Sequence, residues 1–362
     1  MINTLRAMAL FALSSIASIR STSLPPYPFQ VEDGVIKNSE GMIVDMQCVN
    51  WPGHMETNLP EGLQMQPLEM IVDLIVASNL YNSHNPELID EGLGRIFQTV
   101  AEALGEKGVY VLMSNHVSKS SWCCSFDDGN GWWNDEFFSP DAWLDSLTGM
   151  AKLMEGQSNV IAMDLRNELR TDKIGREEQI DDFMKYVPAA IDAVLEGNPD
   201  LLVFVSGLSY DNDWSFLEEG RNSDEWEQAL VSKKSNVVFE SHIYSWSPFG
   251  DISPGESCDN LTFDEHLSWP VRNGFPMVLS EIGTSIDAYE ETDLTWLNCV
   301  RDFILEWRLG YAMWLLTGSY YFRGGELNAP DSFGLLSTDL SGYKSMDIID
   351  KNREMQWGGD SA

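Results

Sequence analysis

Two glutamates in this 362-residue sequence stand where carboxylates could do chemistry together. Glu168 lies at the polar end of the otherwise apolar run Val160 to Leu169, and Glu281 ends a second apolar run that begins at Met277. A protonated carboxyl can give a proton to a leaving oxygen, while an ionised carboxylate can attack or stabilise the neighbouring carbon. The pair therefore predicts the chemistry that cleaves a glycosidic bond, provided that the fold brings the two side chains together. On its own, Glu168 could simply open the next helix.

Apolar β-rich runs and helical patterns alternate along most of the chain. In one helical segment the apolar residues Leu93, Ile96 and Val100 recur at helical spacing. Alternation over this length predicts a parallel sheet with crossover helices. The expected strands are 41–51, 109–113, 160–168, 201–206, 236–244, 277–281 and 311–315; the expected helices are 67–77, 87–107, 141–154, 179–196, 263–273 and 294–309, with a helix or long loop at 214–230.

Polar and aromatic residues at the strand ends favour a closed (β/α)8 TIM barrel over an open sheet. No Gly-x-Gly-x-x-Gly or Gly-x-x-x-x-Gly-Lys loop follows a predicted strand, so open nucleotide-binding sheets lose their main support. In a barrel, the carboxyl ends of all strands converge on one mouth, where active sites are built. The residues expected at this mouth are Asn50, Trp51, His116, Asn167, Glu168, His242, Tyr244, Glu281 and Trp314.

The formal charge of -35 narrows the classes of partner. A nucleic acid or an anionic membrane would require a basic face, so the charge argues against both and favours a neutral ligand. The five cysteines lack the Cys-x-x-Cys spacing of a zinc site, and the five histidines form no His-x-His pair. We therefore expect no metal, no cofactor and a monomer.

The amino terminus is typical of a secretory signal. Arg6 precedes a short apolar run from Ala7 to Ala17, which is too short to span a bilayer. We predict a signal peptide at 1–23, a single barrel domain at 24–350 and a tail at 351–362, with the protein secreted.

Secretion would also give the cysteines a role. Five cysteines allow at most two disulfides and leave one thiol over. The sequon at Asn260 would permit N-glycosylation in the same setting.

Five ordered segments resemble glycoside hydrolase family 5, the cellulase family. They are Asn115 to Ser118 with Trp122 to Ser125, Leu165 to Glu168, His242 to Tyr244, Leu279 to Gly283, and Trp314 through Tyr321. The resemblance runs from about Gly41 to Tyr343 and implies a (β/α)8 barrel that hydrolyses a β-linked glucan or related β-glycan with retention. It also implies that Glu168 is the acid/base and Glu281 the nucleophile, supported by His116, Asn167, His242, Tyr244 and Trp314.

Each supporting residue also has a chemical reason to be there. Asn167 can donate to the sugar 2-hydroxyl, a contact that strengthens in the transition state. His242 and Tyr244, two apart on a strand, project to the same side, where both could reach Glu281 or a sugar hydroxyl. Trp314 offers a flat apolar face to a pyranose ring. The alternatives are core packing for Trp314 and a structural role for each histidine.

The sequence departs from the family after the first predicted helix. Family members carry a second strand there, ending in an Arg that orients the nucleophile and holds it ionised. Here Ile75 is followed by Ser78 to Pro86, which contains neither a strand pattern nor an Arg. Arg166 lies on a different strand and cannot be assumed to replace it. We therefore expect a barrel that lacks one βα unit and exposes two edges.

Two other functions stay open. The missing strand and Arg suggest a catalytically impaired family member, or an incomplete gene product, that at most binds carbohydrate. A metal-dependent barrel hydrolase is a further alternative, disfavoured by the scarcity of histidines. Sugar specificity, linkage and endo or exo action do not follow from these patterns.

Overall fold

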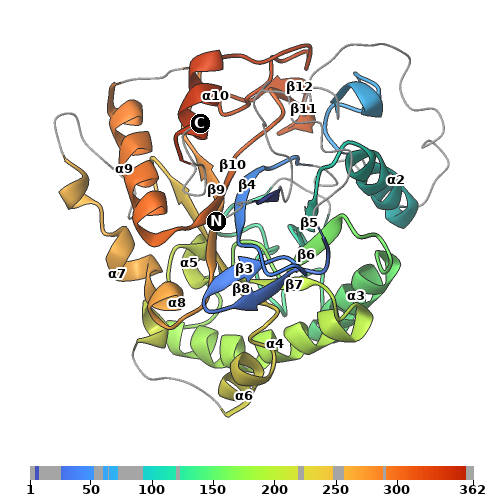
Figure 1. The fold of residues 1–362 in the computed structure, drawn as a ribbon, viewed down its shortest axis with the longest axis vertical. Helices are drawn as coiled ribbons and strands as arrows, with labels where there is room; N and C mark the ends of the chain where they lie inside the picture. The colour runs from blue at the N-terminus through green and yellow to red at the C-terminus, as the bar shows by residue number, and fades with distance from the viewer. Residues whose placement is uncertain are drawn as a thin grey trace.

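A curled parallel sheet surrounded by helices forms the centre of the molecule (Figure 1). The computed structural model describes residues 5–7, 26–52, 60–63, 65–71, 93–119, 123–218, 224–247, 257–287 and 291–355. The main sheet has the strand order β1-β4-β10-β9-β8-β7-β6-β5, and its paired strands run parallel. Seven strands match the predicted ones: β4 Val44–Val49, β5 Val111–Met113, β6 Val160–Asp164, β7 Leu202–Ser206, β8 Val237–Tyr244, β9 Met277–Gly283 and β10 Gly310–Met313.

The strands are buried on both faces, which explains their nearly continuous apolar sequences. Every residue of β6, β7 and β8 is buried. Outward-facing side chains pack on the helices, and inward-facing ones such as Leu202, Phe204 and Val238 form a second core inside the ring. The hairpin of β2 (Gln30–Glu32) and β3 (Val35–Lys37) covers the amino ends of the strands, where Val31 N donates to Ser235 O at 2.7 Å.

The helices follow the predicted alternation. Figure 1 shows α2, α3, α4 and α9 around the outside of the sheet. The helices are α2 Leu93–Glu106, α3 Pro140–Leu153, α4 Arg176–Gly197, α5 Leu208–Asp211, α6 Asp224–Ser232, α7 Phe263–Leu267, α8 Trp269–Arg272, α9 Glu291–Trp307 and α10 Met346–Arg353, with 3-10 turns η2 Ser215–Leu217 and η3 Cys258–Asn260. Among the described residues, none of these helices has the length and apolar character to cross a membrane.

The predicted single helix at 263–273 is two helices, because proline interrupts it. Pro270 has no N–H with which to continue α7 by donating to the carbonyl of His266. That carbonyl instead accepts from Trp214 N at 3.0 Å. Two further elements were not predicted, namely the β2–β3 hairpin and the hairpin of β11 (Ser319–Arg323) and β12 (Glu326–Pro330).

The sheet is open between β4 and β5, as expected for a barrel that lacks one βα unit. These two strands stand at neighbouring places in the ring and do not pair with each other. The short strand β1 (Leu5–Ala7) lies along β4 on this side, with Leu5 opposite Val44 and Ala7 opposite Met46. Residues 72–92, where the sequence shows no second strand or Arg, lie outside the described residues. The fold is therefore a (β/α)8-like barrel whose described part leaves one place in the ring without a βα unit.

Several boundaries predicted from the sequence cannot be compared in full. Only Leu5–Ala7 of the predicted signal peptide is described, so the signal and secretion stay predictions. Helix α10 crosses the predicted boundary at 350 and ends at Arg353, and residues 356–362 lie outside the description.

Candidate active site

A cleft of about 700 Å³ opens at the carboxyl ends of the strands. It brings together residues that are far apart in the sequence, since the strands of a parallel barrel all end at the same mouth. Five predicted site residues line it: His116, Glu168, Tyr244, Glu281 and Trp314. Other lining residues include Cys123, Cys124, Tyr210, Trp246, Arg323 and Asp331.

Glu168 lies four residues beyond the end of β6, on a backbone that turns sharply. Its φ of 48° is in the left-handed region, which non-glycine residues seldom adopt. The carboxylate is 12% exposed, and its Oε1 lies 3.0 Å from His242 Nδ1. The amide N of Glu168 donates to Asp211 Oδ2 at 3.2 Å. The Glu168 side chain therefore enters the cleft from a backbone that is held by Asp211, a residue that follows the neighbouring strand β7.

Glu281 lies within β9 and is almost completely buried, at 5% exposure. Its Oε2 accepts a hydrogen bond from Tyr244 Oη at 2.5 Å and lies 3.4 Å from His242 Nδ1. One oxygen of Glu168, one oxygen of Glu281 and a ring nitrogen of His242 all lie within 4.8 Å of one another. The predicted carboxylate pair and the predicted pair His242 and Tyr244 thus come together.

Burial dominates the electrostatics of this group. It raises the pKa of Glu281 to about 8; His242 and the Tyr244 hydrogen bond oppose the rise, while Glu168 adds to it. For His242, burial lowers the pKa, but Glu281, Asp211 and Glu168 outweigh burial and raise it well above its usual value. In the described part of the chain, His242 is the cationic group that contacts Glu281.

His116 and Trp314 line the cleft, and the buried Asn167 contacts His116. The Asn167 side-chain nitrogen lies 3.5 Å from His116 Nε2, and the His116 ring stacks on Trp314 with 5.7 Å between ring centroids. Burial, with nearby His242, Arg170 and Arg166, lowers the pKa of His116 to about 3, so this ring is neutral. A neutral imidazole next to an indole gives a sugar a flat, uncharged surface.

Two disulfides are present, the number that the cysteine count allowed. Cys258 pairs with Cys299, while the adjacent Cys123 and Cys124 pair with each other in the cleft wall. Asn167 Nδ2 lies 3.7 Å from Cys123 Sγ and 3.6 Å from Cys124 Sγ. The fifth cysteine, Cys48, is buried. The disulfide in the cleft therefore borders the amide expected to contact substrate.

Arg170 ties this wall to the backbone of Glu168. Its guanidinium is 1% exposed and donates to Glu168 O at 2.8 Å, to Ser125 O at 3.1 Å and to Asp128 Oδ2 at 2.7 Å. Sequence reasoning missed this residue, because an Arg two positions after Glu168 carries no pattern of its own.

Arg166, which does not lie on the missing second strand, makes its contacts with residues other than the two glutamates. It pairs with Asp135 at 3.0 Å and donates to Ser118 Oγ at 2.6 Å. Two loop tryptophans, Trp132 and Trp133, are buried in the core, whereas Trp246 is 66% exposed at the cleft.

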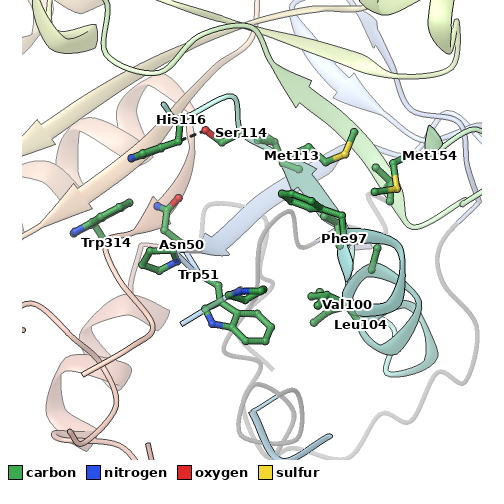
Figure 2. Close-up of a pocket in the computed structure, with 16 residues that line it drawn as sticks. Asn50, Trp51, Phe97, Val100, Leu104, Met113, Ser114, His116, Met154 and Trp314 are labelled. Carbon is green, nitrogen blue, oxygen red and sulfur yellow. Dashed lines mark hydrogen bonds between the residues drawn. The ribbon is translucent and has the colours of Figure 1, made fainter. Parts of the chain in front are cut away.

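A second, smaller pocket of about 110 Å³ lies at the open side of the sheet, and it is called the side pocket below. Figure 2 shows its polar end at Asn50, His116 and Trp314 and its apolar end at Val100 and Leu104 of α2. His116 and Trp314 line both the side pocket and the cleft. The side pocket, which lies at the open side of the sheet, therefore adjoins the cleft at His116 and Trp314.

Within the described part of the chain, two groups of side chains could ligate a metal. One is Glu168, His242 and Glu281, and the other is His116 with Cys123 and Cys124. In the second group both sulfurs belong to a disulfide, so no thiolate is available. The first group is equally suited to acid–base chemistry, the use predicted from the sequence.

The cellulase model of glycosyl hydrolase family 5 matches residues 70–319. The chain belongs to glycosyl hydrolase family 5. A glycosyl hydrolase 5 family protein from Chamaecyparis obtusa is 30% identical over 369 positions, which cover 89% of this chain and 64% of the relative. The alignment has 369 positions, which is more than the number of residues that this chain contributes to it. The relative therefore has residues within the aligned region that have no counterpart in this family member.

Solved endoglucanases share the fold at low identity. The catalytic domain of the major endoglucanase from Xanthomonas campestris pv. campestris is 18% identical with a TM-score of 0.71, covering 91% of this chain and 100% of that one. A hyperthermophilic endocellulase from Pyrococcus horikoshii is 17% identical with a TM-score of 0.69, covering 92% and 100%. These likenesses support the barrel assignment of this family 5 member.

Proposed function

We propose that this family 5 glycoside hydrolase is a retaining, endoglucanase-like enzyme acting on a β-linked glucan or related β-glycan. The observation that carries the proposal is the approach of Glu168 and Glu281 to within 4.8 Å around His242. Retaining glycosidases hold their two carboxyl groups about 5 to 5.5 Å apart, whereas inverting enzymes leave room for a water between them. The short separation favours direct attack by one carboxylate.

In the first step, Glu168 gives its proton to the glycosidic oxygen while Glu281 attacks the anomeric carbon. The carbon–oxygen bond breaks, the shortened glycan leaves as an alcohol, and a glycosyl ester forms on Glu281. In the second step, ionised Glu168 takes a proton from water, whose oxygen attacks the same carbon and releases Glu281. Two displacements at one carbon return the original configuration.

The surroundings suit these roles. Tyr244 and His242 both contact Glu281 Oε2, so they can stabilise its charged form before attack and after release. Asn167, next to Glu168, can hold the sugar 2-hydroxyl, and the Trp314 face can carry the ring.

Two glutamine variants test the proposal and separate the roles. Glu281→Gln should lose activity on every substrate. Glu168→Gln should lose about 10²- to 10⁴-fold on a soluble glucan, because general acid–base catalysis contributes about that much. On a dinitrophenyl β-glycoside, whose leaving group needs no proton, Glu168→Gln should keep the fast first step.

Rates should be measured for both substrates, with the anomer of the first product followed by proton NMR. Glu102→Gln, an exposed charge on α2, is the matched control and should behave as wild type. Equal rates in wild type and Glu281→Gln, or an α product, would contradict the proposal.

No Arg contacts Glu281 among the residues that the structure describes, and this favours a second candidate, a family member that binds carbohydrate with little turnover. Among the described residues, His242 and the Tyr244 hydroxyl oppose the burial that raises the pKa of Glu281 to about 8, and no Arg is among the groups that do so. Calorimetric binding of a cello-oligosaccharide without release of reducing ends at pH 6 to 9 would support this candidate, and turnover would exclude it.

A further inference from the structure

Asp211 is a buried acid that contacts both halves of the catalytic group, and sequence reasoning did not find it. Burial raises the pKa of Asp211 well above its usual value, and the charge of His242 opposes that rise. It follows β7 at the end of α5 and is 0% exposed. Its Oδ2 accepts from the Glu168 amide at 3.2 Å and lies 3.4 Å from His242 Nε2. One side chain therefore touches the backbone of one glutamate and the ring that bridges both.

The backbone that presents Asp211 is strained. Ser209, Tyr210 and Asp211 have φ values of 56°, 61° and 59°, so three consecutive non-glycine residues are left-handed. Left-handed backbone is unfavourable for residues other than glycine, and such strain persists where the surroundings impose it, often at functional sites. Here Tyr210 N donates to Leu169 O at 3.2 Å, which anchors the turn beside Glu168. The turn places the Asp211 carboxylate behind His242.

The ring of His242 faces carboxylate oxygens at both nitrogens. Nδ1 faces Glu168 and Glu281, and Nε2 faces Asp211. A neutral imidazole donates from one nitrogen only, whereas the imidazolium donates from both. The geometry is complementary to the charged ring. Its other charged or titratable neighbours are Asp164, Glu240 and His116.

We propose that Asp211 is a positioning residue that holds His242 as an imidazolium between the two catalytic glutamates, where it acts as the counterion of Glu281. This inference rests on the proposed roles of those glutamates. With Asp211 in place, the productive arrangement is an ionised Glu281 beside a charged His242. Without Asp211, the proton on His242 Nδ1 shifts toward Glu281, and the nucleophile is neutralised with no change in the number of bound protons.

The test is the titration of His242 in wild type and in Asp211→Asn, followed by long-range proton–nitrogen NMR of the imidazoles. The chain has five histidines, so the spectrum is simple, and loss of one signal in His242→Gln assigns it. In wild type, His242 should stay protonated well above pH 6.5. In Asp211→Asn its midpoint should fall by about one unit or more, because an opposite charge in contact shifts a pKa by about that much.

Asp213→Asn is the matched control. It removes the same charge two residues away, from a carboxylate that pairs with Arg176 at 2.7 Å and not with His242. Its His242 midpoint should equal that of wild type. A wild-type midpoint near pH 6.5, or equal midpoints in Asp211→Asn and wild type, would overturn the proposal.

Kinetics give a second readout that depends on the proposed function. Asp211→Asn should lower kcat about tenfold or more with little change in KM, since one pKa unit is a factor of ten in protonation. The alkaline limb of its rate profile should move to lower pH, which a purely structural defect would not cause; an unmoved limb would count against the proposal. If NMR shows the shift but no variant or wild type turns over glucan, the proposed function fails and the role of Asp211 stands.

Discussion

The closed side of the sheet, from β6 to β9, and its open side, between β4 and β5, differ in chemical character. Strands on the closed side are consecutive, paired and buried, and they carry the charged groups Glu168, His242 and Glu281. The side pocket on the open side is lined mainly by apolar residues, with no carboxylate among them. The charge of the candidate site is concentrated where the backbone is most completely paired.

This difference has a physical reason. Carboxylates buried within 4.8 Å of each other must be held in place, because a small displacement would change both their separation and their pKa values. Parallel strands paired on both sides supply that rigidity. The rings of His116 and Trp314 line both the cleft and the side pocket; in their proposed role they need only present a flat surface, which the open side allows.

Core leucines should show the largest contrast between the two sides. Leu147 of α3 and Leu104 of α2 are both buried helix residues, 0% and 1% exposed, but only Leu104 lines the side pocket. Leu147→Ala should destabilise by about 4 kcal/mol and Leu104→Ala by about 2, because a side chain beside an existing cavity loses fewer contacts. Urea unfolding measures both. Equal losses would mean that the open side is packed as tightly as the closed side.

The buried acids of the closed side should make stability depend on pH. Burial raises the pKa of Glu281 from 4.5 to about 8, so its contribution to stability is present below about pH 4.5 and is lost as pH rises to about 8. Wild-type Tm should therefore fall over this interval. Glu281→Gln should weaken the fall and raise Tm at pH 8 by a few degrees. A lower Tm for the variant at pH 8 would contradict this, and Glu102→Gln again serves as the control.

Much of the closed side could be predicted from sequence, for a simple reason. Buried parallel strands are apolar, their polar ends converge, and so Glu168, His242, Tyr244 and Glu281 could be placed together before any geometry was known. The same reasoning gave no ground to place Arg166 beside Glu281, and in the structure Arg166 pairs with Asp135.

What sequence reasoning missed lies in irregular backbone. Asp211 sits in a left-handed turn, which leaves no periodic pattern, although a polar cluster directly after a predicted strand was a usable signal. The β11–β12 hairpin is marked by Gly324 and Gly325, both with positive φ, a turn signal that could have located it.

The smallest predicted effect concerns the rim of the cleft on the closed side. Trp246 follows β8, is 66% exposed and stacks on Tyr244 with 5.0 Å between ring centroids. An exposed indole stacked on the tyrosine that contacts the proposed nucleophile can carry a sugar beyond the cleavage point, and such a contact is worth about 1 kcal/mol. Trp246→Ala should therefore raise KM about fivefold for a glucan oligosaccharide and leave an aryl monosaccharide unaffected. Phe137→Ala removes an exposed ring that does not line the cleft and should change neither value. If Trp246→Ala impaired the hydrolysis of both substrates equally, Trp246 would support Tyr244 and Glu281 instead of binding sugar. The tightly held part of the closed side would then extend to the surface of the protein.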